Sequence, residues 1–276
     1  MNNLYLFWYS NIVLENMEYD NFGDLLSKYI IEKISKKNVK WILPKKGILS
    51  LFQRKHFIAI GSVVRVSNRN SVVWGSGIIH KNEVIAAGEF VAVRGPLTRK
   101  RLLDLGHNVP KTYGDPALLI SRFFKPKVIK SKKIGILPHY VDYKKVHNEL
   151  SDNDLFEVVD LMTNDVESVL KKIMTFDLII SSSLHGIIVP NSYQIPVVWM
   201  RFSEKLTGDD VKFYDYFESL NIKSIKKLTI EVSILNDINS KEEFKRLYKH
   251  NVILPLSEDV QSLNENLLKT CPFNNL

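Results

Sequence analysis

The sequence predicts an α/β protein with two parallel-sheet units, and two observations support this fold class. Short apolar runs of strand length alternate with amphipathic runs of helix length along most of the chain. A basic, proline-containing segment, Phe123–Lys133, interrupts the alternation, which then restarts. A chain of 276 residues also has the length of two ordinary domains. We therefore read the segment as a linker and expect domains at residues 1–124 and 125–235.

The N-terminal domain is predicted from apolar and amphipathic runs. Asp24–Lys36 is expected to be a helix, because its apolar residues recur on one helical face. Pro96–Leu105 is expected to be a second helix that ends at Gly106, a residue that tolerates the left-handed conformation of a helix C-terminus. Apolar runs predict strands at Leu4–Trp8, Val39–Leu43, His56–Ile60, Val72–Trp74 and Phe90–Val93.

The second domain and the tail follow the same rules. We expect a helix at Asn164–Met174 with Asn164 as its N-cap and Glu167 three residues later. A further helix is expected at His185–Tyr193, in which Pro190 would either introduce a kink or mark the end of the first turn. Apolar runs predict strands at Ile134–Leu137, Phe156–Asp160, Asp177–Ile180 and Val197–Met200. Residues 236–276 are expected to pack back on the N-terminal domain through helices at Lys241–His250 and Ser257–Thr270.

Composition limits the possible functions. The net charge of +8 favours anionic partners such as phosphorylated substrates, acidic lipid headgroups or nucleic acid. No nucleic-acid motif with interleaved aromatic residues is recognisable, so we expect no nucleic-acid partner. The single cysteine, Cys271, excludes an internal disulfide or a cysteine zinc site and indicates a reducing compartment. The sequence has no apolar run of transmembrane length and no recognisable signal peptide, which predicts a cytoplasmic location.

The segment Asp177–Pro190 carries the strongest signal for a functional site. A buried strand leads into three serines, then His185 and Gly186, then an apolar run of helical character. Ligands of open α/β sheets bind at the carboxyl ends of strands, and the first amides of the following helix favour an anion. A titratable side chain at this junction makes His185 a candidate acid or base.

A second histidine follows a strand of the same domain. His139 comes directly after Ile134–Leu137, and Asp142 lies close to it in the sequence. Each histidine alone would more often be structural, and two at equivalent strand ends make a functional role as good an interpretation as a structural one. The sequence has no H-x-x-x-H or His/carboxylate spacing typical of a metal site, so we expect no metal.

Glycines and cations mark further strand ends. Asn21-Phe-Gly-Asp24 would either contact an anion or cap the following helix. Gly61-Ser62 and Trp74–Gly77 also follow strands, but neither is a dinucleotide fingerprint, and a structural turn is the better interpretation of Trp74–Gly77. Arg94 would bind a carboxylate or phosphate, or form a salt bridge at the sheet edge. Lys212–Tyr216 would contact an anion and a sugar ring, or form an amphipathic helix.

Together these motifs resemble the polysaccharide pyruvyl transferase family, in the family's order over roughly residues 1–220. The matching pieces are Asn21-Phe-Gly-Asp24, Val93-Arg94, Gly114-Asp115-Pro116, Leu137-Pro-His139, Ser183-Leu-His-Gly186, and Lys212 with Asp215-Tyr216. The resemblance implies a GT-B-like architecture, in which two Rossmann-like domains face each other across a cleft. Some members have an arginine directly before the Leu-His pair. This chain has Ser183 there, so one phosphate ligand is absent or is supplied by Arg201 or Lys212.

The resemblance implies transfer of pyruvate from phosphoenolpyruvate to two hydroxyls of one sugar, forming a cyclic ketal without a metal or organic cofactor. His185 would protonate the methylene carbon, and His139 or a carboxylate, Asp24 or Asp142, would accept the hydroxyl proton. The acceptor would be a precursor of a cell-surface or capsular polysaccharide, often lipid-linked. The expected substrate-binding residues are Asn21, Gly23, Arg94, Ser183, Leu184, Gly186, Arg201 and Lys212.

Two other functions fit parts of the sequence. A nucleotide-sugar glycosyltransferase would share the two-domain cleft, with Glu204 or Asp209 as a ribose-binding carboxylate. A non-enzymatic basic protein that binds anionic lipid or polysaccharide would explain the net charge but not the histidines at strand ends. Peripheral contact with the inner face of an anionic membrane is compatible with the transferase as well.

Overall fold

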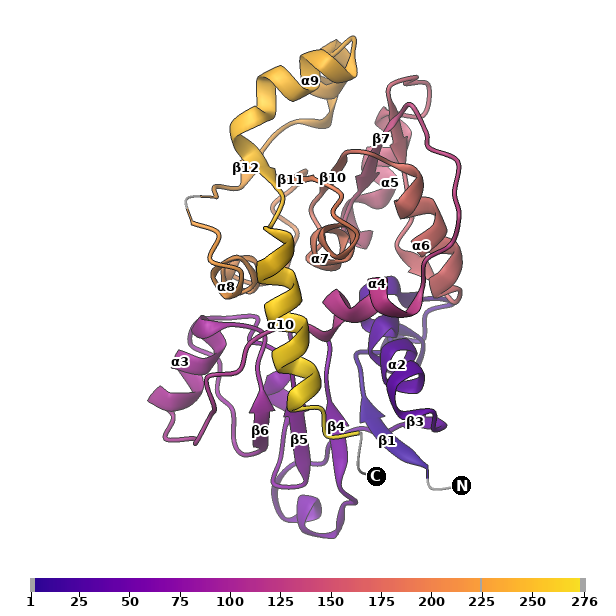
Figure 1. Ribbon diagram of the computed structural model, residues 1–276. Coiled ribbons are helices and arrows are strands. Elements are labelled where there is room, and N and C mark those ends of the chain that lie inside the picture. The colour runs from indigo at the N-terminus through magenta and orange to yellow at the C-terminus, as the bar shows by residue number, and fades with distance from the viewer. Residues whose placement is uncertain (1–2, 224, 274–276) are drawn as a thin grey trace.

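The computed structural model describes residues 3–223 and 225–273, and its strands form two parallel sheets, one above the other in Figure 1. The strands of the first sheet are β1 (Leu4–Phe7), β3 (Val39–Trp41), β4 (His56–Ile58), β5 (Ser71–Trp74) and β6 (Glu89–Ala92). Their order is β3-β1-β4-β5-β6, and every neighbouring pair is parallel.

The strands of the second sheet are β7 (Ile134–Leu137), β8 (Phe156–Val158), β10 (Ile179–Ser181), β11 (Val197–Arg201) and β12 (Leu228–Thr229). Their order is β12-β11-β10-β7-β8, and β13 (Val252–Ile253) pairs antiparallel with β11. Counted along the chain, both sheets have the doubly wound order 2-1-3-4-5, in which ligands bind where the order reverses. These reversals lie between β1 and β4 and between β7 and β10. The predicted α/β class with parallel sheets is confirmed.

Helices connect the strands and cover the sheets (Figure 1). They are α1 (Asn11–Glu15), α2 (Phe22–Ser35), α3 (Pro96–Asp104), α4 (Ile120–Phe123), α5 (Tyr140–Glu149), α6 (Val166–Thr175), α7 (His185–Ser192), α8 (Val211–Ser219), α9 (Lys241–Tyr248) and α10 (Ser257–Lys269). Short 3-10 helices are η1 (Gly47–Phe52), η2 (Val64–Val66), η3 (Pro116–Leu119), η4 (Val232–Asp237) and η5 (Lys249–Asn251).

The starts of two helices differ from the prediction, and side-chain caps explain both. The Asn21 side chain accepts a hydrogen bond from the Gly23 backbone nitrogen at 2.9 Å, so α2 begins before Asp24. The Asp165 carboxylate, and not Asn164, caps α6. It accepts a hydrogen bond from the backbone nitrogen three residues later at 3.1 Å.

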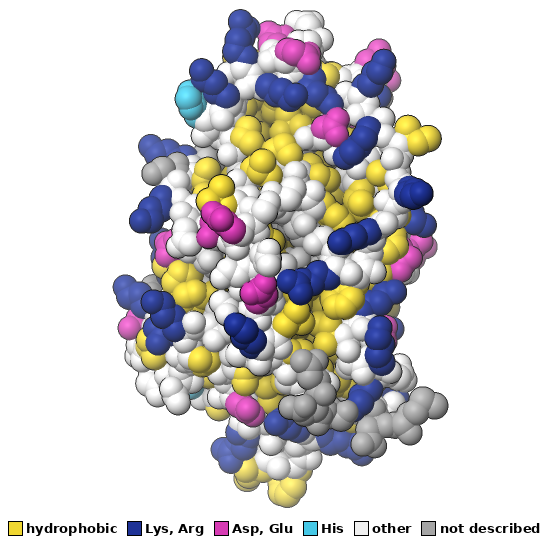
Figure 2. Space-filling view, in the orientation of Figure 1, with side chains coloured by type: hydrophobic (Ala, Val, Ile, Leu, Met, Phe, Trp, Pro, Cys, Tyr) yellow, Lys and Arg dark blue, Asp and Glu magenta, His cyan; other side chains and the backbone are white. Residues whose placement is uncertain are grey.

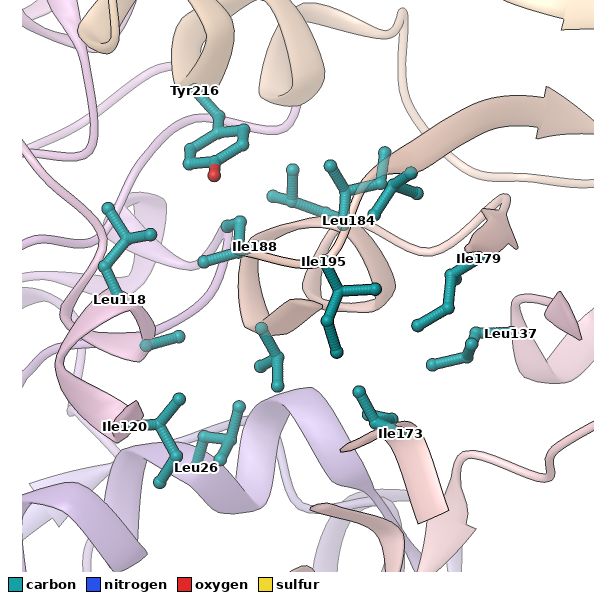
Figure 3. Packing of buried hydrophobic residues seen from close by; sticks show 14 of the residues in the cluster. Leu26, Leu118, Ile120, Leu137, Ile173, Ile179, Leu184, Ile188, Ile195 and Tyr216 are labelled. Carbon is teal, nitrogen blue, oxygen red and sulfur yellow. The ribbon is translucent and has the colours of Figure 1, made fainter. Parts of the chain in front are cut away.

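The two sheets share a hydrophobic core (Figure 3). One cluster takes Leu26 from α2, Leu118 from η3 and Ile188 from α7, together with Leu137 and Ile179 from the second sheet. The loops of the two parts are also paired, since β2 (Asp20–Asn21) runs antiparallel to β9 (Met162–Thr163). The shared core and the β2–β9 pairing hold the carboxyl ends of the two sheets next to each other.

The tail of the chain contacts both sheets. Phe244 of α9 packs edge-on against Phe156 of the second sheet. α10 then runs down to the first sheet, where Trp74 Nε1 donates to the Leu267 carbonyl at 3.0 Å and the Phe273 ring packs against Trp74 (Figure 1). The domain boundaries at residues 124 and 235 stay a prediction. Within the described residues, we find no helix long and apolar enough to span a bilayer.

Candidate active site

A pocket of about 270 Å³ lies between the carboxyl ends of strands from both sheets. Its wall on the side of the first sheet comes from residues that follow β1, β4 and β5, among them Tyr9, Ser62 and Ile79. The opposite wall comes from residues that follow β7, β10 and β11, among them His139, Ser183 and Thr207. Both reversals of strand order therefore open into the same pocket.

The serine turn after β10 sets the position of His185. Ser181 Oγ donates to the Leu137 carbonyl at 2.7 Å and accepts from the Ser183 backbone nitrogen at 3.0 Å, which ties the turn to β7. A Cβ at Gly186 would overlap Ser181 Oγ, so this position requires glycine. α7 begins directly after the turn, and the largely buried imidazole of His185 lines the pocket.

Asp115 lies beside the inner edge of His185. Its Oδ1 accepts a hydrogen bond from Ala117 N at 3.0 Å, as the N-cap of η3. Its Oδ2 lies 3.6 Å from His185 Nε2, and both atoms are buried without a hydrogen-bond partner among the residues that the structure describes. A carboxylate in this position orients the ring and stabilises an imidazolium formed during a reaction. The Gly114-Asp115-Pro116 motif was the sequence signal for this residue, but its proximity to His185 becomes visible only in the fold.

Gly23 allows the imidazole to lie against the start of α2. A Cβ at Gly23 would overlap the His185 ring, with Nδ1 the nearest atom. The ring therefore has Nδ1 toward α2 and Nε2 toward Asp115. Asn21 and Asp24, from the same turn, line the pocket, so Asn21 both caps the helix and contributes to the site.

Asp24 and Lys212 bring opposite charges to the pocket, and both titrate near neutral pH. Burial raises the pKa of Asp24 to about 7, although the neighbouring His185 opposes the rise. Burial lowers the pKa of Lys212 to about 8, and repulsion from Arg94 adds to this effect. Perturbed acids and bases that share a pocket are typical of catalytic and binding sites.

His139 lines the same pocket in its neutral form. Its backbone nitrogen donates to Ser182 Oγ at 2.8 Å, and its Nδ1 accepts from Val141 N at 3.5 Å at the start of α5. Burial lowers the pKa of His139 to about 3, with a further contribution from Lys212. Asp142 is absent from the pocket lining, since its buried carboxyl accepts a hydrogen bond from Ser203 Oγ at 2.5 Å.

A sequence model of the family described as polysaccharide pyruvyl transferase matches residues 11–204. The chain belongs to the polysaccharide pyruvyl transferase family. The matched span contains Asp24, Asp115, His139 and His185, whereas Lys212 lies beyond it. The family resemblance deduced from the sequence motifs is therefore confirmed.

The chain is also similar to a curated protein of Acanthamoeba polyphaga mimivirus, "Uncharacterized protein L143". The two are 34% identical over 212 residues, which are 74% of this chain and 72% of that protein. Among solved structures, it matches the solution structure of the E. coli RcsC C-terminus (residues 700–949), containing a linker region and phosphoreceiver domain. That match covers 91% of this chain and 96% of the other at 14% identity, and its TM-score of 0.26 carries no argument about fold.

Arg94 lies outside the pocket lining of this pyruvyl transferase family member. Its fully buried guanidinium pairs with Asp215 at 3.0 Å and donates to the Ile78 carbonyl and to Ser62 Oγ, both at 2.7 Å. Of the two roles expected for Arg94, the structure shows the salt bridge. Arg94 contacts the pocket wall through its hydrogen bond to Ser62, which lines the pocket. Gly77 packs on the guanidinium, so the Trp74–Gly77 turn is structural.

Arg201 is also removed from the pocket lining. It is buried and pairs with Asp210 at 3.0 Å and with Glu204 at 3.2 Å. Arg65 lines the pocket instead. The sequence contains no signal for this cation, because it lies in the short 3-10 helix η2 and does not directly follow a strand.

The remaining predicted residues divide between the pocket wall and its support. Ser183 and Leu184 line the pocket, whereas Gly186 supports the serine turn. Among residues 3–223 and 225–273, no group of three or more His, Cys, Asp or Glu side chains is arranged to hold a metal ion.

Proposed function

We propose that the protein transfers pyruvate from phosphoenolpyruvate to two hydroxyls of one sugar in a cell-surface or capsular polysaccharide precursor. The product is a cyclic ketal, and no metal or organic cofactor takes part. The observation that carries the proposal is the convergence of His185, Asp24 and Lys212 on one pocket at the carboxyl ends of both sheets. Membership of the pyruvyl transferase family supports the same chemistry.

Phosphoenolpyruvate fits the charge of the pocket. The donor carries a carboxylate and a phosphate, so it needs cations and amide donors. Lys212 and Arg65 line the pocket, and α2, α5 and α7 begin at its wall with their positive dipole ends. With a pKa of about 8, Lys212 is protonated at neutral pH and would bind the donor as a cation.

The saccharide would occupy the part of the pocket formed by polar and aromatic side chains. Tyr9, Asn11 and Tyr140 line this region. Aromatic rings can pack on a sugar face, while amide and hydroxyl groups bind its hydroxyls. A GT-B-like arrangement belongs to the proposal, with the acceptor mainly on the side of the first sheet, at Tyr9 and Asn11, and phosphoenolpyruvate mainly on the side of the second, at the start of α7.

His185 would donate a proton to the methylene carbon of the donor, turning it into a methyl group and leaving a cation-like centre at C2. The first sugar hydroxyl would attack C2 and give up its proton. The carbon–oxygen bond to phosphate then breaks, and the second hydroxyl attacks C2 to close the ketal. A base takes one hydroxyl proton and passes it to the departing phosphate, and the other hydroxyl proton returns to His185, so atoms and charges balance. Asp115 would hold the ring and stabilise its charged form.

Asp24 is a better candidate than His139 for the base that takes the hydroxyl proton. A base works best when its pKa lies near the working pH. The pKa of Asp24 is raised to about 7, whereas that of His139 is lowered to about 3, which makes the latter a very weak base. His139 would then position the acceptor as a neutral hydrogen-bonding group.

The acceptor is proposed to be lipid-linked, and the protein to work in the cytoplasm at the inner face of the membrane. The test of the function is phosphate release from phosphoenolpyruvate with a panel of saccharides that have free 4- and 6-hydroxyls. We expect release only with both hydroxyls free, and the same sugars methylated at one of them serve as controls. Release of a nucleoside phosphate from nucleotide sugars, or no phosphate release from phosphoenolpyruvate with any acceptor, would contradict the proposal.

A further inference from the structure

A surface loop at residues 43–55, here called the tip loop, exposes an unusual number of large apolar side chains. It contains η1 and joins β3 to β4. Phe52 is 86% exposed, Ile48 73% and Leu49 61%, and Leu43 and Leu51 are about half exposed. Apolar side chains so close together on a surface typically mark a binding site.

The tip loop is also strongly basic. Lys45 and Lys46 precede η1, Arg54 and Lys55 follow it, and all four are exposed. The surrounding segment, Lys33–Asn82, contains eleven of the 38 Lys and Arg residues of the chain and no Asp or Glu. The net positive charge of the protein therefore originates in this segment, because acidic residues outnumber basic ones in the rest of the chain.

Hydrogen bonds hold the backbone of the tip loop against the protein. Asn68 Nδ2 donates to the Lys45 carbonyl at 2.9 Å, and Asn70 donates to the Ser50 carbonyl. Gln53 Nε2 donates to the Leu43 carbonyl at 2.7 Å, and its Oε1 accepts from Lys45 N at 2.7 Å. The backbone of the loop is thus anchored while its large apolar side chains face outward, the reverse of the usual burial of apolar side chains.

The tip loop lies at the amino ends of β4 and β5, on the opposite edge of the first sheet from the pocket. Its partners Asn68 and Asn70 directly precede β5, and Lys55 directly precedes β4. This edge is lowest in Figure 1, and Figure 2 shows hydrophobic side chains protruding there beside Lys and Arg. A partner bound at this edge would leave the pocket uncovered.

We propose that the tip loop docks the protein on an anionic lipid bilayer, with Ile48, Leu49 and Phe52 in the headgroup region and the flanking cations on lipid phosphates. Apolar side chains framed by Lys and Arg are the pattern of interfacial membrane binding, in which burial and charge attraction add. Single-stranded nucleic acid would need several aromatic platforms among the cations, and Phe52 is the one aromatic side chain at residues 43–55.

The tip loop would provide the membrane contact that is part of the proposed function. Docking itself can be measured without any enzymatic turnover. It is tested by sedimentation of the full chain with phosphatidylcholine vesicles that contain or lack phosphatidylglycerol. We expect binding only to the anionic vesicles, weakened by salt. Replacing two of the outward side chains, Ile48→Asn with Phe52→Asn, should lower binding more than about tenfold, because each buried methylene contributes about 0.8 kcal/mol. Lys45→Gln with Lys46→Gln should weaken it and reduce its salt dependence.

Ile129 provides a matched control, because it is 92% exposed and lies in the basic segment Phe123–Lys133. Ile129→Asn should bind vesicles like the wild type, and every variant should keep the wild-type melting temperature. Absence of wild-type binding, or equal loss with Ile129→Asn, would overturn the inference. So would tip-loop variants that alter only self-association or RNA binding. Unchanged phosphate release alongside failed docking would leave the proposed function standing.

Discussion

Asp24 lies in an environment that raises its pKa far above that of an ordinary surface carboxylate. It belongs to the first turn of α2, faces the pocket, and has its pKa raised by burial from 3.8 to about 7. The folded protein therefore holds the Asp24 proton to a higher pH than the unfolded chain does. This contribution to stability is complete below about pH 4 and is lost as the pH rises through about 7. Above about pH 7 the buried, ionised Asp24 therefore lowers the stability of the folded protein, a cost that is common at functional sites.

We expect Asp24→Asn to be more stable than the wild type at pH 8, because an amide has no charge to bury. The gain should be on the order of 1–3 kcal/mol, since each pKa unit corresponds to about 1.4 kcal/mol and pocket water screens part of it. At pH 4 the two proteins should unfold alike. Urea unfolding at both pH values measures the difference, with the exposed Asp152→Asn as control. An Asp24→Asn variant less stable than the wild type at pH 8 would contradict the raised pKa of Asp24.

For single residues, the sequence identified those that follow strands or start helices. It did not identify the buried partners that the fold brings next to them. His185, His139, Asp24 and Lys212 line one pocket, as their positions after strands or at helix starts suggested. Asp115 escaped assignment because its partner His185 is far away in the sequence. The cations Arg94 and Arg201 carried the right charge, but their buried carboxylate partners were not readable from local sequence.

Arg94 and Asp215 connect two elements, since one follows β6 and the other lies in α8. Both side chains are fully buried and 3.0 Å apart, and Thr98 donates to both carboxylate oxygens of Asp215. Gly95 lies so close to Asp215 that any side chain there would collide with it. The pair thereby fixes α8, the helix that carries Lys212, against the first sheet.

Removing one partner of this pair should be far worse than removing both. We expect Asp215→Ala to lower the free energy of unfolding by about 3–5 kcal/mol, because the Arg94 charge would stay buried without a partner. The double variant Arg94→Met with Asp215→Leu should recover much of the loss. Chemical denaturation measures both, and the exposed pair Lys55–Glu89 should contribute at most about 1 kcal/mol. A single variant no less stable than the double would refute this role.

Elements with strong apolar patterns were predictable, and those with weak patterns were not. Every predicted strand is present. The strands β4, β5, β7, β10 and β11 are buried along their whole length and appear as mostly apolar runs, as is typical of parallel sheets. α5 has no such signal, since it buries only Asp142 and Val146 among ten residues. The true start of α6 depended on which of two adjacent cap residues, Asn164 or Asp165, reaches the backbone.

The whole molecule is held together by contacts that cross between the sheets. One hydrophobic cluster includes residues of α2 and of β10. After the chain has left the second sheet, Leu267 of α10 and Phe273 beyond it pack on the first sheet. The alternation of strands and helices predicted two units, but such long-range packing has no local signature in the sequence. The pocket depends on it, because its two walls come from different sheets.

We therefore expect the two sheets to unfold together. Calorimetry should give one transition with equal calorimetric and van't Hoff enthalpies, as for a single cooperative unit. Phe273→Ala, which opens the contact with Trp74, should lower the free energy of unfolding by about 3–5 kcal/mol and preserve the single transition. Two separate transitions in the wild type would mean that the sheets are independent.

In the proposed reaction, the imidazole of His185 in the shared pocket delivers a proton to an enol phosphate. The rate of phosphate release from phosphoenolpyruvate by His185→Gln, with a competent acceptor present, tests it most directly. We expect a loss of about 10²–10⁴-fold relative to the wild type, whereas His80→Gln, a change at an exposed histidine, should have no effect. Wild-type release by a folded His185→Gln variant would contradict the account.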